Sequence, residues 1–162
     1  MAADYLISSL QPLDIDGPAP YTQEQFAAMC REQLGDDPFP AAAARWADLD
    51  AQLRNAVAAE RARARGGDGA RWRRPVHGCS LYWANRVAAA FQEKNPAARD
   101  RLLDLVWWDA AGTLTPPAAP RSAAAALTYA VRLGIVIRRR AASAEAGNAV
   151  FDALTAASRI EF

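Results

Sequence analysis

The chain has 162 residues, 52% of them hydrophobic and 23% charged, and this length predicts one domain whose core needs no disulfide or metal. Its net charge of +1 at pH 7 disfavours a general nucleic-acid binder, because such proteins are usually strongly basic. The two cysteines are far apart and no basic, apolar leader precedes them, which favours a reduced, soluble protein of the cytoplasm.

The charges are unevenly distributed along the chain. Residues 1–50 carry a net charge of −7, residues 51–76 carry +5, and the remainder carries +3. Such polarity is typical of a protein that uses its charges internally or docks between partners of opposite sign.

The first segment fits more than one local structure. Tyr5–Leu10 is an apolar run whose length suits either a strand or one and a half turns of helix. Three prolines within residues 12–20 favour an extended backbone after it. We therefore expect residues 1–21 to form an extended N-terminal segment.

A helix is expected to follow this segment. Thr22 and Gln25 have the spacing of a capping box, in which each side chain bonds the backbone N–H of the other residue. Gly35 is expected to end the helix. Cys30 falls on its apolar face, so we interpret it as a small core residue.

The longest predicted helix covers Ala41–Arg65, which contains no glycine or proline and is rich in Ala, Leu and Arg. Pro38 and Pro40 precede it, and three glycines within residues 66–69 end it. We expect other helices to pack around this long central helix. Its large apolar residues recur at helical spacing and are assigned to the core: Trp46, Leu49, Leu53 and Val57.

The opposite face of this helix is built mostly of alanine and includes Asn55. Asn55 either lies half-exposed on a solvated face or bonds a backbone group of a helix packed closely there. Arg61 is six residues further on, about 120° around the helix, so we expect it to act separately. Arg61 would begin a basic edge that meets an acidic partner surface.

Residues 66–79 are predicted to form a loop, and its basic and aromatic residues are the strongest candidates for partner contact. They are Arg71, Trp72, Arg73 and Arg74. Arg and Trp dominate the binding energy of many protein interfaces. In the alternative interpretation, Trp72 packs into the core and the arginines are solvated. His77 is expected to be a loop histidine without a special role.

Two helices are expected next, over Ser80–Lys94 and Asn95–Ala111, separated by the Asn-Pro pair that begins the second. The spacing predicts that Leu81 and Leu102 point inward. Residues 112–121 contain three prolines and are predicted to form a surface loop.

The segment Leu127–Ile137 alternates like a strand, but the cap at Ser122 and the alanines after it favour a helix. Arg138–Arg140 would mark the end of that helix, where cations are favoured by the helix dipole. A last helix is expected from about Ser143 to Leu154. The sequence thus predicts an all-α fold, with residues 1–162 forming a single compact bundle of about five helices.

No enzyme signature is present in the sequence. The glycine-rich stretch lacks the Gly-Lys-Ser/Thr of a phosphate-binding loop, and no Gly-x-Ser-x-Gly motif occurs. His77 and Cys79 are too few ligands for a zinc site. We therefore expect no catalytic activity, no cofactor and no bound metal.

Several short motifs resemble a bacterial domain-of-unknown-function family whose genes accompany V-type ATPase operons. They are Tyr5–Leu10, Trp46-x-x-Leu49-Asp50, Leu53-Arg54-Asn55 with Arg61, and Leu127–Ala130. The Asn55-x5-Arg61 step is also similar to a motif of the V-type ATPase C/d subunits, which are all-helical and seat the central stalk on the membrane rotor.

The resemblance implies a non-catalytic subunit or accessory protein of a bacterial V-type ATPase. Its partners would be ATPase subunits on the cytoplasmic side, and it would meet the membrane only through that complex. A nucleic-acid-binding helical module that uses Arg71–Arg74 and Arg138–Arg140 is the alternative, and steep salt dependence of binding would support it. An enzyme that uses His77 is the third hypothesis.

Overall fold

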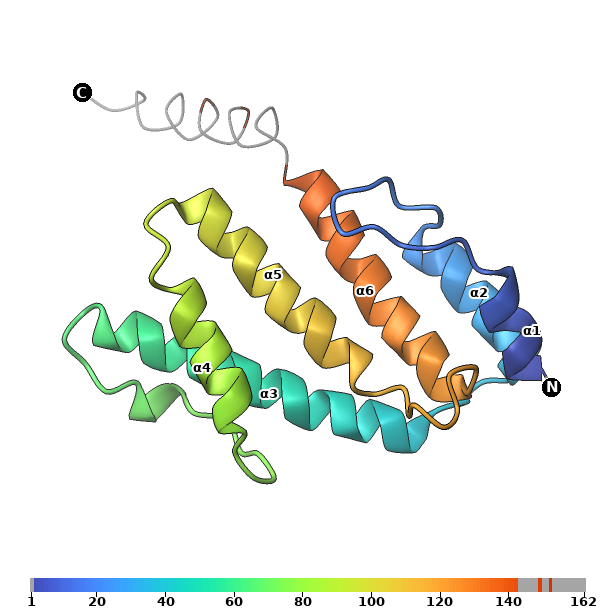
Figure 1. Ribbon diagram of the computed structural model, residues 1–162, viewed down its shortest axis with the longest axis horizontal. Helices are drawn as coiled ribbons and strands as arrows, with labels where there is room; N and C mark the ends of the chain where they lie inside the picture. The colour runs from blue at the N-terminus through green and yellow to red at the C-terminus, as the bar shows by residue number, and fades with distance from the viewer. Residues whose placement is uncertain (1, 143–148, 150–151, 153–162) are drawn as a thin grey trace, which may run out of the picture.

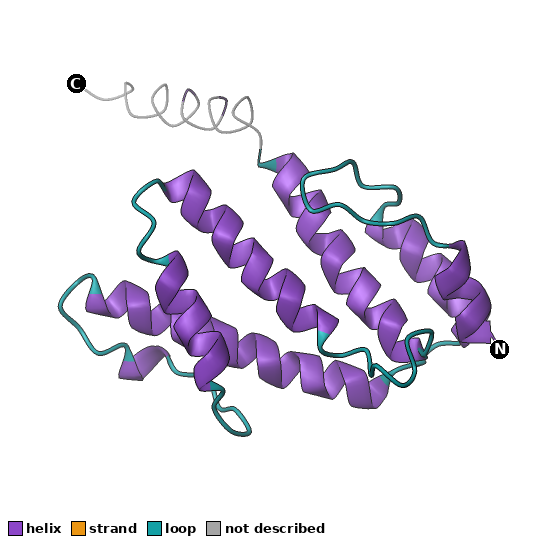
Figure 2. Cartoon of the chain, viewed as in Figure 1, coloured by secondary structure: helices purple, strands orange, loops and turns teal. Residues whose placement is uncertain are grey.

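The computed structural model describes residues 2–142, 149 and 152. Within these residues the fold is entirely helical, as the sequence predicts (Figure 2). The helix expected over residues 143–154 lies outside the described range 2–142. The elements in chain order are α1 (Ala2–Ser9), α2 (Gln23–Leu34), α3 (Pro40–Arg63), the short 3-10 helix η1 (Ala70–Trp72), α4 (Leu81–Ala90), α5 (Pro96–Gly112) and α6 (Ala123–Ala141).

The helices form two groups, with α1, α2 and α6 in one and α3, α4 and α5 in the other (Figure 1). Helices α1 and α2 pack against one side of α6, and α5 packs against another. Helix α3 runs along the ends of this layer and packs on α4, α5 and α6. Burial places α6, more than the long α3, at the middle of the described fold, since α6 contributes six buried residues and α3 two.

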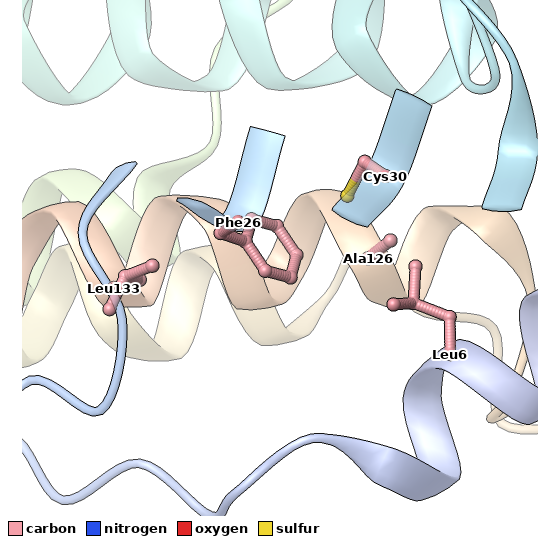
Figure 3. Packing of buried hydrophobic residues seen from close by; sticks show 5 residues of the cluster. All are labelled: Leu6, Phe26, Cys30, Ala126 and Leu133. Carbon is pink, nitrogen blue, oxygen red and sulfur yellow. The ribbon is translucent and has the colours of Figure 1, made fainter. Parts of the chain in front are cut away.

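The core consists of two apolar clusters. One joins α1, α2 and α6 through Leu6, Phe26, Cys30, Ala126 and Leu133 (Figure 3). The second joins α3, α4 and α5 through Leu53, Trp83, Val87, Val106 and Ala110. Trp46, Leu49 and Val57 are half-buried against the second cluster, so the apolar stripe of α3 faces the core as expected.

Local sequence signals account for the starts of α2 and α5 and for the end of α2. Thr22 and Gln25 form the predicted capping box, with N–O distances of 3.1 and 2.8 Å. The Asn95 side chain accepts hydrogen bonds from two backbone N–H groups in the first turn of α5. Gly35 ends α2 with a φ of +89°, which only glycine adopts without strain.

Several sequence expectations are wrong. Residues 1–21 are not wholly extended, because residues 2–9 form α1 around the buried Leu6. Helix α4 ends at Ala90, and the Gln92 and Glu93 N–H groups make tighter turn bonds instead of continuing it. Ser80 and Ser122 stand at cap positions, but their side chains accept no hydrogen bond from the first turn of the helix.

Three burial assignments also need correction. Leu81 is 73% exposed and Leu102 is 38% exposed, so neither points inward as predicted. Leu114, in the loop predicted to lie on the surface, is 1% exposed. Leu81 is the first residue of α4, two residues before the buried Trp83 and six before Val87, so its side chain falls off the face that these two residues define.

Candidate functional site

A cavity of about 1100 Å³ opens between the C-terminal half of α3, the loop through η1, α5 and the end of α6. We call this cavity the groove. Its lining includes seven arginines and three aspartates, so positive charge dominates it. The arginines are Arg54, Arg61, Arg65, Arg71, Arg74, Arg138 and Arg139. Apolar side chains, among them Val57, Leu103 and Trp107, line it too.

The groove joins basic segments that are far apart in the sequence. Arg61 lies on α3, Arg71 and Arg74 lie on the following loop, and Arg138 lies near the end of α6. The sequence assigns Arg138 to a helix terminus and to the alternative nucleic-acid-binding surface, and it does not single out Arg65. Arg73 does not line the groove, so its predicted partner contact stays a prediction outside this cavity.

Polar side chains of α3 hold one side of the groove in place. Asp48, Gln52 and Asn55 are spaced four and three residues apart, which puts them on one face of the helix. They bond the backbone of residues 74–80, which runs past them. We call these three residues the polar ladder.

Within the ladder, the Asn55 side chain makes two hydrogen bonds to the backbone of one residue, Arg74. Its amide N–H₂ donates to the Arg74 carbonyl at 2.9 Å, and its side-chain oxygen accepts from the Arg74 N–H at 2.8 Å. Asn55 therefore does bond a backbone group, but that group belongs to a loop and not to a packed helix. Asn55 and Arg61 both line the groove, and their separate roles, structural for Asn55 and partner contact for Arg61, stay a prediction.

The rest of the ladder secures the loop further along. Gln52 accepts from the Ser80 N–H at 3.0 Å, and Asp48 accepts from the His77 N–H at 2.5 Å. The His77 N–H, followed by the Gln52 amide, holds the pKa of Asp48 below its usual value of 3.8. The His77 ring nitrogen lies 3.3 Å from the same carboxylate, while its side chain is fully exposed.

The loop after α3 comes close to the alanine face of this helix at Gly69. Gly69 is buried and has a φ of +69°. A Cβ built there would lie 3.1 Å from the Ala62 Cβ and 3.3 Å from the Ala58 carbonyl oxygen. Small residues on both elements thus let the backbone approach, and the chain turns from α3 into η1 across this contact.

The arginines of the groove divide into paired and unpaired groups. Arg138 and Arg139 both bond Asp104, and Arg139 also pairs with Asp16 at 2.7 Å. Arg54 pairs with Asp50 at 2.6 Å. No carboxylate within the described residues pairs with the remaining four, which are Arg61, Arg65, Arg71 and Arg74.

Asp16 links the N-terminal loop to this region. Its carboxylate pairs with Arg101 at 2.6 Å as well as with Arg139. The hydrogen bond from Arg101 is the main reason that the pKa of Asp16 lies below its usual value. The positive charges of the α6 end are therefore largely compensated by the chain itself.

Trp72 lines the groove and is 61% exposed, which excludes the alternative that it packs into the core. The Arg71 guanidinium carbon lies 4.4 Å from the centre of this ring. An aromatic ring stacked with a cation offers both an apolar face and a charge to a partner.

The described residues hold no cluster of three or more His, Cys, Asp or Glu side chains that could bind a metal. In the same part of the chain no helix has the length and apolar character needed to cross a membrane. The guanidinium groups that line the groove can recognise an anionic surface, and Trp72 and the apolar lining add contact area.

Comparison with family models, with curated proteins and with solved structures gives no match to this chain.

Proposed function

We propose that the protein is a non-catalytic subunit or accessory protein of a bacterial V-type ATPase, and that the groove contacts an acidic surface of the central stalk or rotor. The short motifs described above, which include Asn55 and Arg61, are the reason for naming this complex. The groove supports the mode of contact.

The observation that carries this proposal is the set of four unpaired arginines in one groove. A protein gains nothing in stability from like charges held together, because they repel one another. An acidic partner would supply the missing carboxylates, and Arg–carboxylate contacts can be bidentate. Such complementarity also speeds the encounter of two proteins, especially at low salt.

Binding to the purified stalk assembly of the same ATPase tests the proposal. A triple variant with Arg61→Glu, Arg71→Glu and Arg74→Glu reverses three of the unpaired charges. We expect it to bind at least about a hundredfold more weakly than the wild type, because each lost charged contact is worth roughly 1.5–3 kcal/mol.

A matched control reverses three exposed arginines outside the groove, Arg73, Arg121 and Arg140. It changes the net charge by the same amount, so it separates a local contact from a general effect of charge. Equal weakening by both triple variants would contradict a role of the groove. Absence of binding by the wild type would remove the ATPase stalk as the partner.

A nucleic-acid-binding module is the second candidate, and the exposed Trp72 stacked with Arg71 favours it. Aromatic rings beside arginines stack on the bases of single strands, at about 1–3 kcal/mol per base. Affinity for a single-stranded oligonucleotide that falls steeply with salt, and falls further with Trp72→Ala, would support this candidate. Undetectable binding at low salt would exclude it.

A further inference from the structure

A second, smaller cavity lies on another side of the molecule from the groove, and it contains a half-buried arginine. Its volume is about 410 Å³, and its lining comes from α1, the loop after α1, the C-terminal end of α5, the following loop and α6. Arg132 of α6 and Gly112 of α5 both line it. We call it the Arg132 pocket.

The Arg132 guanidinium is held against the end of α5. Its Nε donates to the Trp108 carbonyl at 3.1 Å, and its central carbon lies 4.8 Å from the centre of the Trp108 ring. Its Nη2 lies against Gly112, only 2.7 Å from where a Cβ would be. The absence of a side chain at residue 112 therefore makes room for the guanidinium.

Within the described part of the chain, no carboxylate lies within ion-pair distance of Arg132. Asp109 is the acid whose charge acts on it, but the Asp109 carboxylate pairs with Arg86 at 2.6 Å. Burial lowers the pKa of Arg132, which means that its surroundings disfavour the cation. A charge in such a place costs free energy unless a counter-ion compensates it.

The remaining polar groups of the pocket restrict what that counter-ion can be. The Thr128 hydroxyl donates to the Ala111 carbonyl at 3.0 Å, so the Thr115 hydroxyl, 2.8 Å away, donates to Thr128. The Tyr129 hydroxyl donates to the Gln11 carbonyl at 2.8 Å. All three hydroxyl hydrogens are used, and Arg132 is the cationic donor that the pocket offers to an anion.

Apart from Gln11, the rest of the pocket wall is apolar and includes Ile7, Leu10, Leu13, Pro120 and Ala125. We propose that this pocket binds a small organic monoanion, a carboxylate with a short apolar chain, whose carboxylate meets the Arg132 guanidinium and whose chain lies along these apolar side chains. A phosphate dianion suits the pocket less, because one guanidinium would have to satisfy two charges.

Octanoate is the probe for this proposal, with octanol, acetate and inorganic phosphate for comparison, and calorimetric titration measures their binding to the whole chain. We expect octanoate to bind at least about tenfold more tightly than octanol, which lacks the charge, and than acetate, which lacks the chain. Octanol binding as tightly as octanoate, phosphate binding more tightly than octanoate, or no binding of octanoate would each overturn the proposal.

Two variants locate the site. Arg132→Gln removes the cation and should weaken octanoate binding by about tenfold or more. Gly112→Ala keeps the cation but displaces Nη2, so it should weaken binding even if Arg132→Gln fails to fold. Arg140→Gln, an exposed arginine of the same helix, is the control and should bind octanoate normally. Normal octanoate binding by a folded Arg132→Gln protein would refute the assignment, as would normal binding by Gly112→Ala.

Discussion

The two walls of the groove are held in place by different interactions. The α5–α6 wall packs through buried apolar side chains such as Val106 and Val136, and its arginines Arg138 and Arg139 are paired with aspartates. The α3 wall consists of the C-terminal half of α3 and residues 66–80. The hydrogen bonds of the polar ladder hold this loop against the helix. Four arginines of this wall, at positions 61, 65, 71 and 74, are unpaired within the described residues, whereas Arg54 pairs with Asp50.

This difference separates two uses of arginine in one small domain. On the α5–α6 wall, arginine joins elements to one another, since Arg139 bonds both the N-terminal loop and α5. On the α3 wall, the backbone is fixed by neutral and acidic side chains of α3, which leaves the guanidinium groups available. The predictions below test whether the walls differ in this way.

The largest expected effect comes from Leu53→Ala, which acts on both walls. Leu53 is fully buried between α3, α4 and α5. Replacing it leaves a cavity and should lower the free energy of unfolding by about 2–5 kcal/mol, measured by urea denaturation. A loss below about 0.5 kcal/mol would mean that α3 is not anchored by its apolar stripe.

Asn55→Ala should act on the α3 wall alone. It removes both bonds to the Arg74 backbone, and we expect a loss of about 1–2 kcal/mol in the free energy of unfolding. Amide hydrogen exchange should increase at the Arg74 N–H while it stays unchanged in α5 and α6. Protection at Arg74 that survives the substitution would show that the ladder does not hold this loop.

Acid should weaken the ladder at Asp48. The pKa of its carboxyl is lower in the folded chain than the usual 3.8, so its stabilisation is fully present above about pH 4. It is lost as the pH falls through the lowered value, because protonation then removes the charge that accepts the His77 N–H.

Denaturation of the wild type and of Asp48→Asn at pH 7 and at successively lower pH values measures this contribution. The difference in their free energies of unfolding should be constant above about pH 4 and shrink below it. A difference that stays constant into strong acid would contradict a stabilising ionised Asp48.

Much of the fold follows from local signals in the sequence. Long α3, from Pro40 to Arg63, is bounded by a proline and by glycines close to its predicted ends. The caps at Thr22 and Asn95 begin α2 and α5 as predicted. The segment Leu127–Ile137 is helical despite its alternating pattern, because the alanines before it and the packing of α6 between α2 and α5 outweigh the alternation.

The candidate site could be predicted only in part. Arg61, Arg71, Trp72 and Arg74 stand out by composition, but whether Trp72 is exposed depends on the loop path that the polar ladder sets. The end of α6 lies more than 60 residues after Arg74 in the sequence. Only the packing of the helices in the folded chain brings the two together at the groove. The six-residue run Tyr5–Leu10 fits a strand as well as a helix, and the contacts of α1 with α2 and α6 decide for the helix.

The most direct test compares one arginine from each wall, Arg71→Gln and Arg138→Gln. Both substitutions remove one charge, and for each variant the affinity for the ATPase stalk at low salt and the free energy of unfolding are measured. Arg71→Gln should change stability by less than about 0.5 kcal/mol and weaken binding by about tenfold or more.

Arg138→Gln should show the reverse order, with a measurable loss of stability and a smaller loss of affinity, because its charge is already paired with Asp104. That pattern would support the assignment of the unpaired arginines to partner binding. Unchanged affinity for Arg71→Gln, or a larger loss of affinity for Arg138→Gln, would contradict it.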